Sequence, residues 1–366
     1  VLGRSFRRTV LREVLARESI VVDTATIDRL GEFIDADGDQ RWRFRNGLVR
    51  DVTYDGLGFR LRERLHRAAG EAIEGISVDV SVDADVLALH FSEANENERA
   101  FRYSDLAAQR AERSYAYPAA VGHLERAVAA ARRLSDVSPA DRAEVMVRLG
   151  AAQSQAGLID EALEAFAAAA RLVDDPIRRN EIRLMRAEVR EHAAAYPSAL
   201  RELTRIRTSL SDDESERARR LRARCAAFRA VVRQRQERVE RARRAAEVAV
   251  LEAESAGEHA ALARALSVLS WVRLVAGDDD PLRDAERALE VLLCAIEVAA
   301  GDLEVAEPFQ AHREVTLPAG IAGLSGGHKS KPAERALAVM LCAIEVAAGD
   351  LEVAERVQAL REVTLP

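Results

Sequence analysis

The chain has 366 residues and a formal net charge of −7, which argues against a protein that binds nucleic acid over its whole surface. Hydrophobic residues make up 48% of the chain and aromatic residues only 4%, a composition typical of helical arrays with cores of Ala, Leu and Val. Cys225, Cys294 and Cys342 lie far apart without disulfide or metal-ligand spacing, and the longest apolar run, at 291–296, is too short to span a bilayer. We therefore expect a cytoplasmic protein without a cofactor, a metal or a membrane segment.

Residues 1–78 differ from the rest of the chain. The segments FRRTVLREVLARES and TATIDRLGEFIDAD have helical periodicity. The turn signal DGDQ then precedes Trp42 and Phe44, which alternate with arginines and predict a short strand or hairpin. Because helices flank this strand element, we expect a small winged-helix-like module here, and almost no further strand after it.

Residues 143–176 follow a helix–turn–helix rhythm of 34 residues. Counted from Ala143, Gly150 falls at position 8, Ala162 at 20, Phe166 at 24 and Ala169 at 27. These are the positions at which tetratricopeptide repeats place small residues where two helices cross, and a larger one at 24. Gly157 marks the turn between the two helices.

Two other segments repeat the same spacing less strongly. The unit at 101–134 has Ala108, Ala120, Leu124 and Ala127 at these positions, and a unit from residue 180 has Ala187, Ala199, Leu203 and Ile206. Such units bury their apolar faces only by stacking. We expect an all-α fold in which residues 79–318 form a right-handed tetratricopeptide-like solenoid of helical hairpins behind the N-terminal module.

The N-terminal segments VLGRSF, RLGEFIDADGDQRWRFRNGLVRDVTYDGL and FRLRERLHRAAGEAIE resemble a known arrangement. They are similar to the region that follows the ATPase core in bacterial signal-transduction ATPases, among them multidomain adenylate/guanylate cyclases and LuxR-type regulators. The resemblance implies a winged-helix-like remnant after a missing ATPase core, followed by tetratricopeptide repeats. At the strand–helix junction this chain has Asn46-Gly47 where the family commonly has a histidine, which puts a nucleotide-sensing role for that position in doubt.

Several motifs that carry chemistry are incomplete. The segment GLSGGHKS at 323–330 has His328 where a phosphate loop requires glycine, and no apolar strand precedes it. Ser325 fits the nucleophile elbow of a hydrolase, whose catalytic residues follow in the chain order Ser, Asp, His. No histidine lies beyond His328 to complete that order. The histidines are scattered, and we expect His66 and His90 to pack in a core or interface rather than to bind metal. We predict no catalytic residue in this chain.

The tetratricopeptide resemblance implies a partner-binding groove at positions 2, 5, 9, 12 and 13 of each repeat. In the unit at 101–134 these positions hold Arg102, Asp105, Gln109, Glu112 and Arg113. In the unit that starts at residue 180 they hold Glu181, Leu184, Glu188, Glu191 and His192. The alternative is a merely solvated surface. Residues 201–245 carry 15 arginines against 7 acidic residues, and predict either a solvated, partly paired helical face or a docking surface for an acidic partner.

Residues 285–318 and 333–366 are identical at 29 of 34 positions. The first copy has Pro308 inside a helix and His312 on its packing face, so the second copy is the better formed. We predict a flexible linker at 319–332 and a duplicated terminal hairpin at 333–366.

The sequence as a whole predicts a non-catalytic scaffold that binds a protein or peptide partner, or another domain of its parent protein. The alternative is a fragment of an ATP-dependent cyclase or LuxR-type regulator whose catalytic or DNA-binding domains lie outside it.

Overall fold

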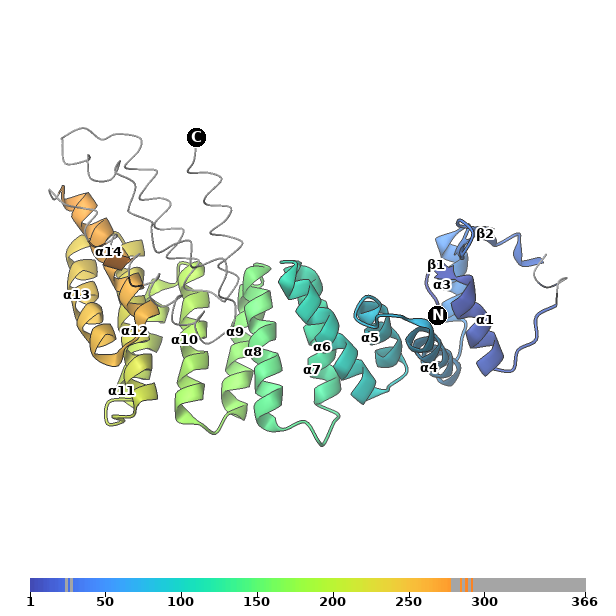
Figure 1. The fold of residues 1–366 in the computed structure, drawn as a ribbon, viewed down its shortest axis with the longest axis horizontal. Coiled ribbons are helices and arrows are strands. Elements are labelled where there is room, and N and C mark those ends of the chain that lie inside the picture. The colour runs from blue at the N-terminus through green and yellow to red at the C-terminus, as the bar shows by residue number, and fades with distance from the viewer. Residues whose placement is uncertain (24–25, 27–28, 278–283, 285–286, 289–290, 292–366) are drawn as a thin grey trace, which may run out of the picture. The chain divides into compact units, whose positions relative to one another are not determined.

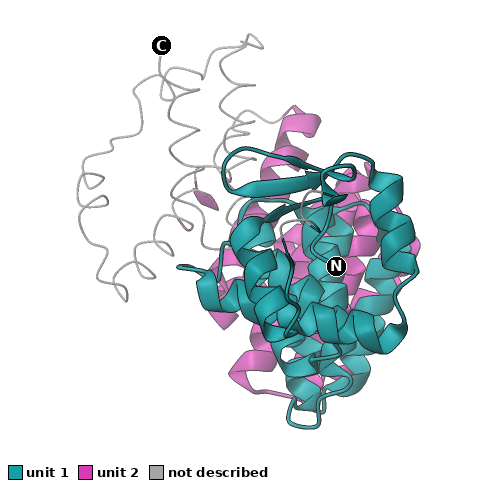
Figure 2. Cartoon of the chain, turned by 90° about the vertical axis from the view of Figure 1, so that its right-hand side faces the viewer, with its two compact units in different colours: residues 1–174 teal, residues 175–366 magenta. Residues whose placement is uncertain are grey.

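The computed structural model describes residues 1–291 apart from 24–25, 27–28, 278–283, 285–286 and 289–290 (Figure 1). The chain divides into two compact units, residues 1–174 and residues 175–366 (Figure 2). The predicted linker at 319–332 and the predicted hairpin at 333–366 lie outside the described residues, as do Cys294 and Cys342.

Unit 1 begins with a three-stranded antiparallel sheet. The middle strand β3 pairs Trp42 with Phe6 of β1, and Phe44 with Ile34 of β2. The Phe6 ring meets Trp42 edge-on at 6.5 Å and Phe44 at 6.1 Å, which accounts for the alternation of aromatic residues and arginines in β3. The predicted strand at Trp42 and Phe44 is therefore confirmed, whereas the helix predicted through residues 34–36 is wrong, because these residues pair with β3 as strand β2. The elements are β1 Ser5–Arg7, α1 Arg8–Arg17, β2 Ile34–Ala36, β3 Arg41–Phe44, α3 Gly47–Asp55 and α4 Phe59–Ile76.

The helices next to the sheet share a hydrophobic core with the helices that follow. Val10 and Val14 of α1, together with residues of α4, pack with Phe91 of α5 and Tyr103 of α6. Gly70 permits this packing, because a Cβ atom there would lie 2.9 Å from the Phe91 ring. Asn46 caps α3 by accepting a hydrogen bond from the backbone N–H of Leu48 at 2.9 Å.

The rest of the described chain consists of helices joined into antiparallel hairpins. Ser138 and Asp175 cap two of these helices, and each is followed by a proline at the first helical position. Unit 1 contains α5 Ala84–Glu93, α6 Asn97–Arg113, α7 Tyr117–Ala131, α8 Pro139–Gln155 and α9 Ile159–Leu172. Unit 2 contains α10 Pro176–His192, α11 Tyr196–Ser209, α12 Glu216–Arg235, α13 Val239–Ala256 and α14 His259–Ala276.

The predicted repeat positions are the buried contacts of these hairpins. Phe166 of α9 packs on Gly150 of α8, where an added Cβ atom would lie 3.0 Å from the ring. The small residues at position 20 and the apolar residues at 24 are at most 2% exposed in all three predicted units, Ala120, Leu124, Ala162, Phe166, Ala199 and Leu203. An all-α, tetratricopeptide-like fold of helical hairpins, with a small sheet at its N-terminus, is thus confirmed.

One turn geometry recurs between successive helices. A residue in the left-handed region ends the first helix, and the N–H of the next residue donates to the carbonyl oxygen five residues back. Gly157 occupies this position between α8 and α9, as the sequence predicts. The equivalent positions hold Gly257 between α13 and α14 and, elsewhere, non-glycine residues with φ of 55°, Asn95, Tyr115, Ala194 and Glu237.

Helix α14 is, within the described residues, the one helix long and apolar enough to cross a membrane by length and composition. Half of that window is buried inside the protein. Leu262 and Leu266 pack with Ala249 and Val250 of α13, so α14 is accounted for as a core helix of unit 2.

Candidate functional site

The first predicted groove set lies on α6, where an ion-pair cluster brings three of its members together. Arg148 of α8 donates to Asp105 through Nη1, and to the Glu112 oxygens through Nε and Nη2 at 3.3 and 2.7 Å. Gln109 donates to the other oxygen of Asp105 at 2.8 Å. The cluster joins the first helices of two consecutive hairpins.

The Arg148 cluster is half-buried and carries one net negative charge. The side chains of Arg148, Asp105 and Glu112 are about 30% exposed. Burial opposes the charge on Arg148, but the hydrogen bonds that Glu112 and Asp105 accept from it outweigh this effect and raise the pKa of the guanidinium. Asp105 and Glu112 therefore hold α6 to α8, in addition to any role toward a partner.

The remaining members of the first set are exposed to solvent. Arg102 is exposed, and its guanidinium lies over the Tyr103 ring at 4.9 Å. Arg113 is exposed in the last turn of α6. These two cations flank the Arg148 cluster along the helix and add positive charge to an otherwise acidic face.

The second predicted set lies on α10, where each glutamate faces an arginine. Glu181 pairs with Arg178 of the same helix at 2.9 Å, and Glu188 pairs with Arg264 of α14 at 3.6 Å. The guanidinium of Arg264 also lies over the Phe228 ring of α12, at 6.0 Å from its centroid. Side chains from α10, α12 and α14 thus meet on one face of unit 2.

The end of α10 is less uniform than the sequence predicts. Glu191 is buried and pairs with Arg235 of α12 at 3.2 Å, whereas His192 is exposed. Leu184 is 2% exposed and packs in the core of unit 2 with Leu203 and Leu221. The assignment of Leu184 to an open groove is therefore wrong, because the apolar side of α10 faces its neighbouring helices there.

A buried histidine pair joins α4 to α5. Nδ1 of His66 lies 3.0 Å from Nδ1 of His90, and Nε2 of His66 lies 3.1 Å from the Tyr54 hydroxyl of α3. One Nδ1 must donate and the other accept, so the accepting ring is neutral and the contact cannot form between two protonated rings. Burial is the main cause that lowers the pKa of His66 to about 4 and that of His90 to about 3.

The histidine pair was expected in a core or interface, and both side chains are 3% exposed there. Their direct contact was not predicted, because 24 residues separate them. Among the described residues, no group of three or more His, Cys, Asp and Glu side chains is placed to hold a metal ion.

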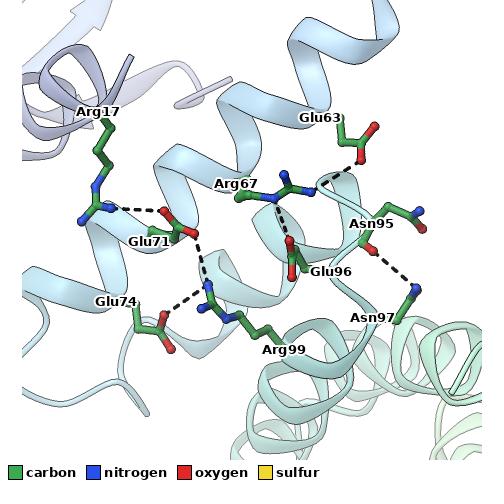
Figure 3. Close-up of polar contacts among 9 residues, drawn as sticks. All are labelled: Arg17, Glu63, Arg67, Glu71, Glu74, Asn95, Glu96, Asn97 and Arg99. Atoms are coloured by element: carbon green, nitrogen blue, oxygen red, sulfur yellow. Dashed lines mark hydrogen bonds and ion pairs between the residues drawn. The ribbon is translucent and has the colours of Figure 1, made fainter. Parts of the chain in front are cut away.

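Polar contacts also connect α4 with the helices on either side (Figure 3). Glu71 pairs with Arg17 of α1 at 3.1 Å and with Arg99 of α6 at 3.5 Å. Arg67 pairs with Glu96, just before α6, at 2.6 Å. These side chains are roughly one-third to two-fifths exposed, so each pair adds little stability by itself. The pairs fix the orientation of α4 rather than form a reactive site.

Cys225 and Asp175 both have structural roles. The Cys225 thiol is fully buried, and burial raises its pKa to about 12, so it does not ionise near neutral pH. Asp175 accepts a hydrogen bond from the backbone N–H of Ile177 at 2.9 Å and caps α10. The segment GLSGGHKS lies outside the described residues.

The arginine-rich segment 201–245 is largely a solvated helical face, with pairs along the helices. Arg220 pairs with Glu216 one turn earlier at 2.6 Å, and Arg243 pairs with Glu240 at 2.9 Å. Arg207 of α11 reaches Glu252 of α13 through two hydrogen bonds of 2.7 and 2.8 Å. Some arginines of this segment are therefore structural.

Comparison with known proteins places the chain by its fold alone. No family model matches it, and no curated protein matches it. Aspartyl phosphate phosphatase F from Bacillus subtilis is similar in structure with a TM-score of 0.51 and 12% identity, over 82% of this chain and 77% of that one.

Two further structures have lower similarity. A signal transduction ATPase with numerous domains (STAND) protein with a tetratricopeptide repeat sensor, from Pyrococcus horikoshii, has a TM-score of 0.38 and 12% identity, over 80% of this chain and 42% of that one. The apo form of the quorum sensor NprR from B. thuringiensis has a TM-score of 0.44 and 9% identity, over 97% of both chains.

Proposed function

We propose that this chain is a non-catalytic scaffold that binds a protein or peptide partner through the polar faces of its helical hairpins. The Arg148 cluster carries the proposal, because it holds charged side chains of α6 and α8 in fixed positions between two exposed arginines. Fixed charges on neighbouring helices offer a partner a surface that is already organised, which lowers the entropic cost of binding. On α10 the proposed binding residues are Glu181, Glu188, Glu191 and His192.

The test is a charge reversal on the proposed face. A partner identified with the full chain is purified, and its affinity is measured for the wild type and for Arg102→Glu/Arg113→Glu. We expect the dissociation constant to rise at least about tenfold, because two exposed charges at the interface become repulsive.

The matched control is Arg132→Glu/Arg171→Glu, which changes the same charge at exposed positions in or just after the second helices, α7 and α9. The control is expected to bind within about twofold of the wild type, because exposed charges outside the interface contribute little to the affinity. Unchanged binding by Arg102→Glu/Arg113→Glu would remove the α6 face from the proposal.

A second candidate function is that of a regulatory region within a larger signalling ATPase of the cyclase or LuxR-type kind. The observation that favours it is an exposed apolar face on α3, where Leu48 and Val52 lie one turn apart and are 67% and 64% exposed. Phe59, at the start of α4, is 76% exposed. Apolar side chains of this size in solvent are typical of a contact with another domain.

This second candidate is tested by translating the genomic DNA on both sides of the region that encodes this chain. A phosphate loop or a cyclase domain upstream, or a helix-turn-helix downstream, would support it, and an open frame without any of them would contradict it. In either case the chain itself is expected to hydrolyse no ATP above background, and phosphate release that survives repurification would overturn the non-catalytic assignment.

A further inference from the structure

Helices α12 and α13 form a groove with positively charged walls. The groove has a volume of about 320 Å³. Four arginines and two apolar residues line it. We call it the arginine groove, lined by Arg229 and Arg233 of α12 and by Arg241, Arg244, Ala245 and Val248 of α13.

The spacing of these residues places them along two facing helix edges. Arg229 and Arg233 are one turn apart on α12, and Arg241, Arg244 and Val248 are three and four residues apart on α13. Arg233 is half-buried, whereas the other three arginines are exposed. Val248 is 44% exposed, so one apolar side chain lies beside the charges.

Five other arginines of the same helices have carboxylate partners. Arg217, Arg222 and Arg235 of α12 pair with Asp175, Glu214 and Glu191, in addition to the pairs made by Arg220 and Arg243. Across the described part of the chain, no carboxylate forms an ion pair with an arginine of the arginine groove. Arg233 donates instead to the side-chain oxygen of Gln236 at 2.9 Å.

No ion pair with a carboxylate therefore offsets the repulsion among these guanidinium groups. Burial, and then the charges of Arg241, Arg238 and Arg229, lower the pKa of Arg233. An anion in the groove would relieve this repulsion. Arginine is the cation whose planar fork matches a carboxylate with two parallel hydrogen bonds.

The lining favours an acidic protein segment over a nucleic acid. Single-stranded nucleic acids bind by stacking their bases on aromatic rings, and the arginine groove contains none. An amphipathic helix presents acidic side chains every three to four residues beside an apolar stripe, which matches arginines one turn apart beside Val248.

We propose that the arginine groove binds an acidic amphipathic helix of a partner protein. This inference does not rest on the proposed function of the α6 and α10 faces, because its residues lie on different helices. Either proposal can fail while the other holds.

The test uses the full chain and a defined probe. The probe is an 18-residue amphipathic peptide labelled with fluorescein, with glutamates one turn apart beside a leucine stripe, and its affinity is measured by fluorescence anisotropy in 50 mM NaCl. We expect Arg241→Gln/Arg244→Gln to weaken binding at least about tenfold, since two charge-assisted contacts are lost. A peptide with glutamine in place of glutamate is expected to bind weakly to both proteins.

The control variant, Arg220→Gln/Arg243→Gln, removes the same charge from the same two helices outside the groove, and is expected to bind within about twofold of the wild type. Circular dichroism checks that each variant is helical. Should Arg241→Gln/Arg244→Gln fail to fold, Arg241→Lys/Arg244→Lys keeps the charge, loses the planar fork and is expected to give an intermediate loss.

Three results would overturn the proposal: no binding of the probe to the wild type, equal binding by the groove and control variants, or equal binding of the glutamine peptide. A single-stranded DNA 20-mer serves as competitor. If it binds the groove more tightly than the probe, the groove recognises nucleic acid and the assignment to an acidic helix is wrong.

Discussion

Arg148 and the four arginines of the arginine groove have opposite surroundings. In unit 1, Arg148 lies between Asp105 and Glu112 and ties α6 to α8. In unit 2, the four arginines of the arginine groove face one another, without a carboxylate partner in the described part of the chain. An arginine that is neutralised within the chain stabilises helix packing. One that is left unpaired contributes little to the fold and remains available to a partner.

The buried histidine pair extends the comparison to a contact that two protonated rings cannot form. The pKa values of His66 and His90 in the folded chain, about 4 and about 3, lie below the value near 6.5 of an unfolded histidine. Between these limits the unfolded chain binds protons that the folded chain does not. The contribution to stability is therefore complete above pH 6.5 and is lost as the pH falls toward 4.

We expect the free energy of unfolding to fall by about 2–4 kcal/mol between pH 6.5 and pH 5, the largest effect predicted here. Urea unfolding measures it. His66→Phe/His90→Leu should flatten this dependence, whereas His259→Gln, which replaces an exposed histidine of α14, should leave it unchanged. A wild-type curve as flat as that of the double variant would contradict the neutral pair.

Replacing Arg148 tests the arginine that is paired within the chain. Arg148→Met leaves two half-buried carboxylates facing each other, and we expect a loss of about 2 kcal/mol in the free energy of unfolding. The matched change in the arginine groove, Arg229→Met, should cost less than about 0.5 kcal/mol because no ion pair is lost. Equal losses for the two variants would show that the surroundings of the arginines do not distinguish their roles.

The turn that joins α12 to α13 allows the arginine groove to be stabilised without a change in its charge. Glu237 adopts the left-handed conformation that Gly157 adopts between α8 and α9. Glu237→Gly should raise the free energy of unfolding by about 0.5–1 kcal/mol, because the strain on a side chain in this region is removed. Gly157→Ala should lower it by a similar amount. Thermal unfolding of both variants, with opposite shifts in Tm expected, checks the prediction.

The sequence predicts the hairpins because their information is local and periodic. A small residue and a larger apolar residue recur at fixed places in a 34-residue unit. In the unit at 143–176 these are Gly150 and Phe166, and the structure packs one on the other. The strand at Trp42 follows from alternation next to a turn. In each case, neighbours in sequence determine which face of the element is buried.

Contacts between helices carry no such period. His66 meets His90 across 24 residues, and Arg148 reaches Glu112 across 36. Periodicity gives the face on which each of these residues lies, but it does not give the rotation and offset between helices that decide which side chains touch. For the same reason, the count of arginines in 201–245 did not separate paired side chains from those of the arginine groove.

The most direct test of the central claim is the free energy of unfolding of Arg241→Gln/Arg244→Gln at low ionic strength. If the arginine groove holds unpaired, mutually repelling charges, this variant is as stable as the wild type or gains about 0.5 kcal/mol at 10 mM salt, and the gain disappears at 300 mM salt, where screening is strong. A loss as large as that of Arg148→Met would mean that these arginines are paired within the chain, and would contradict the distinction between arginines that stabilise the fold and arginines that bind a partner.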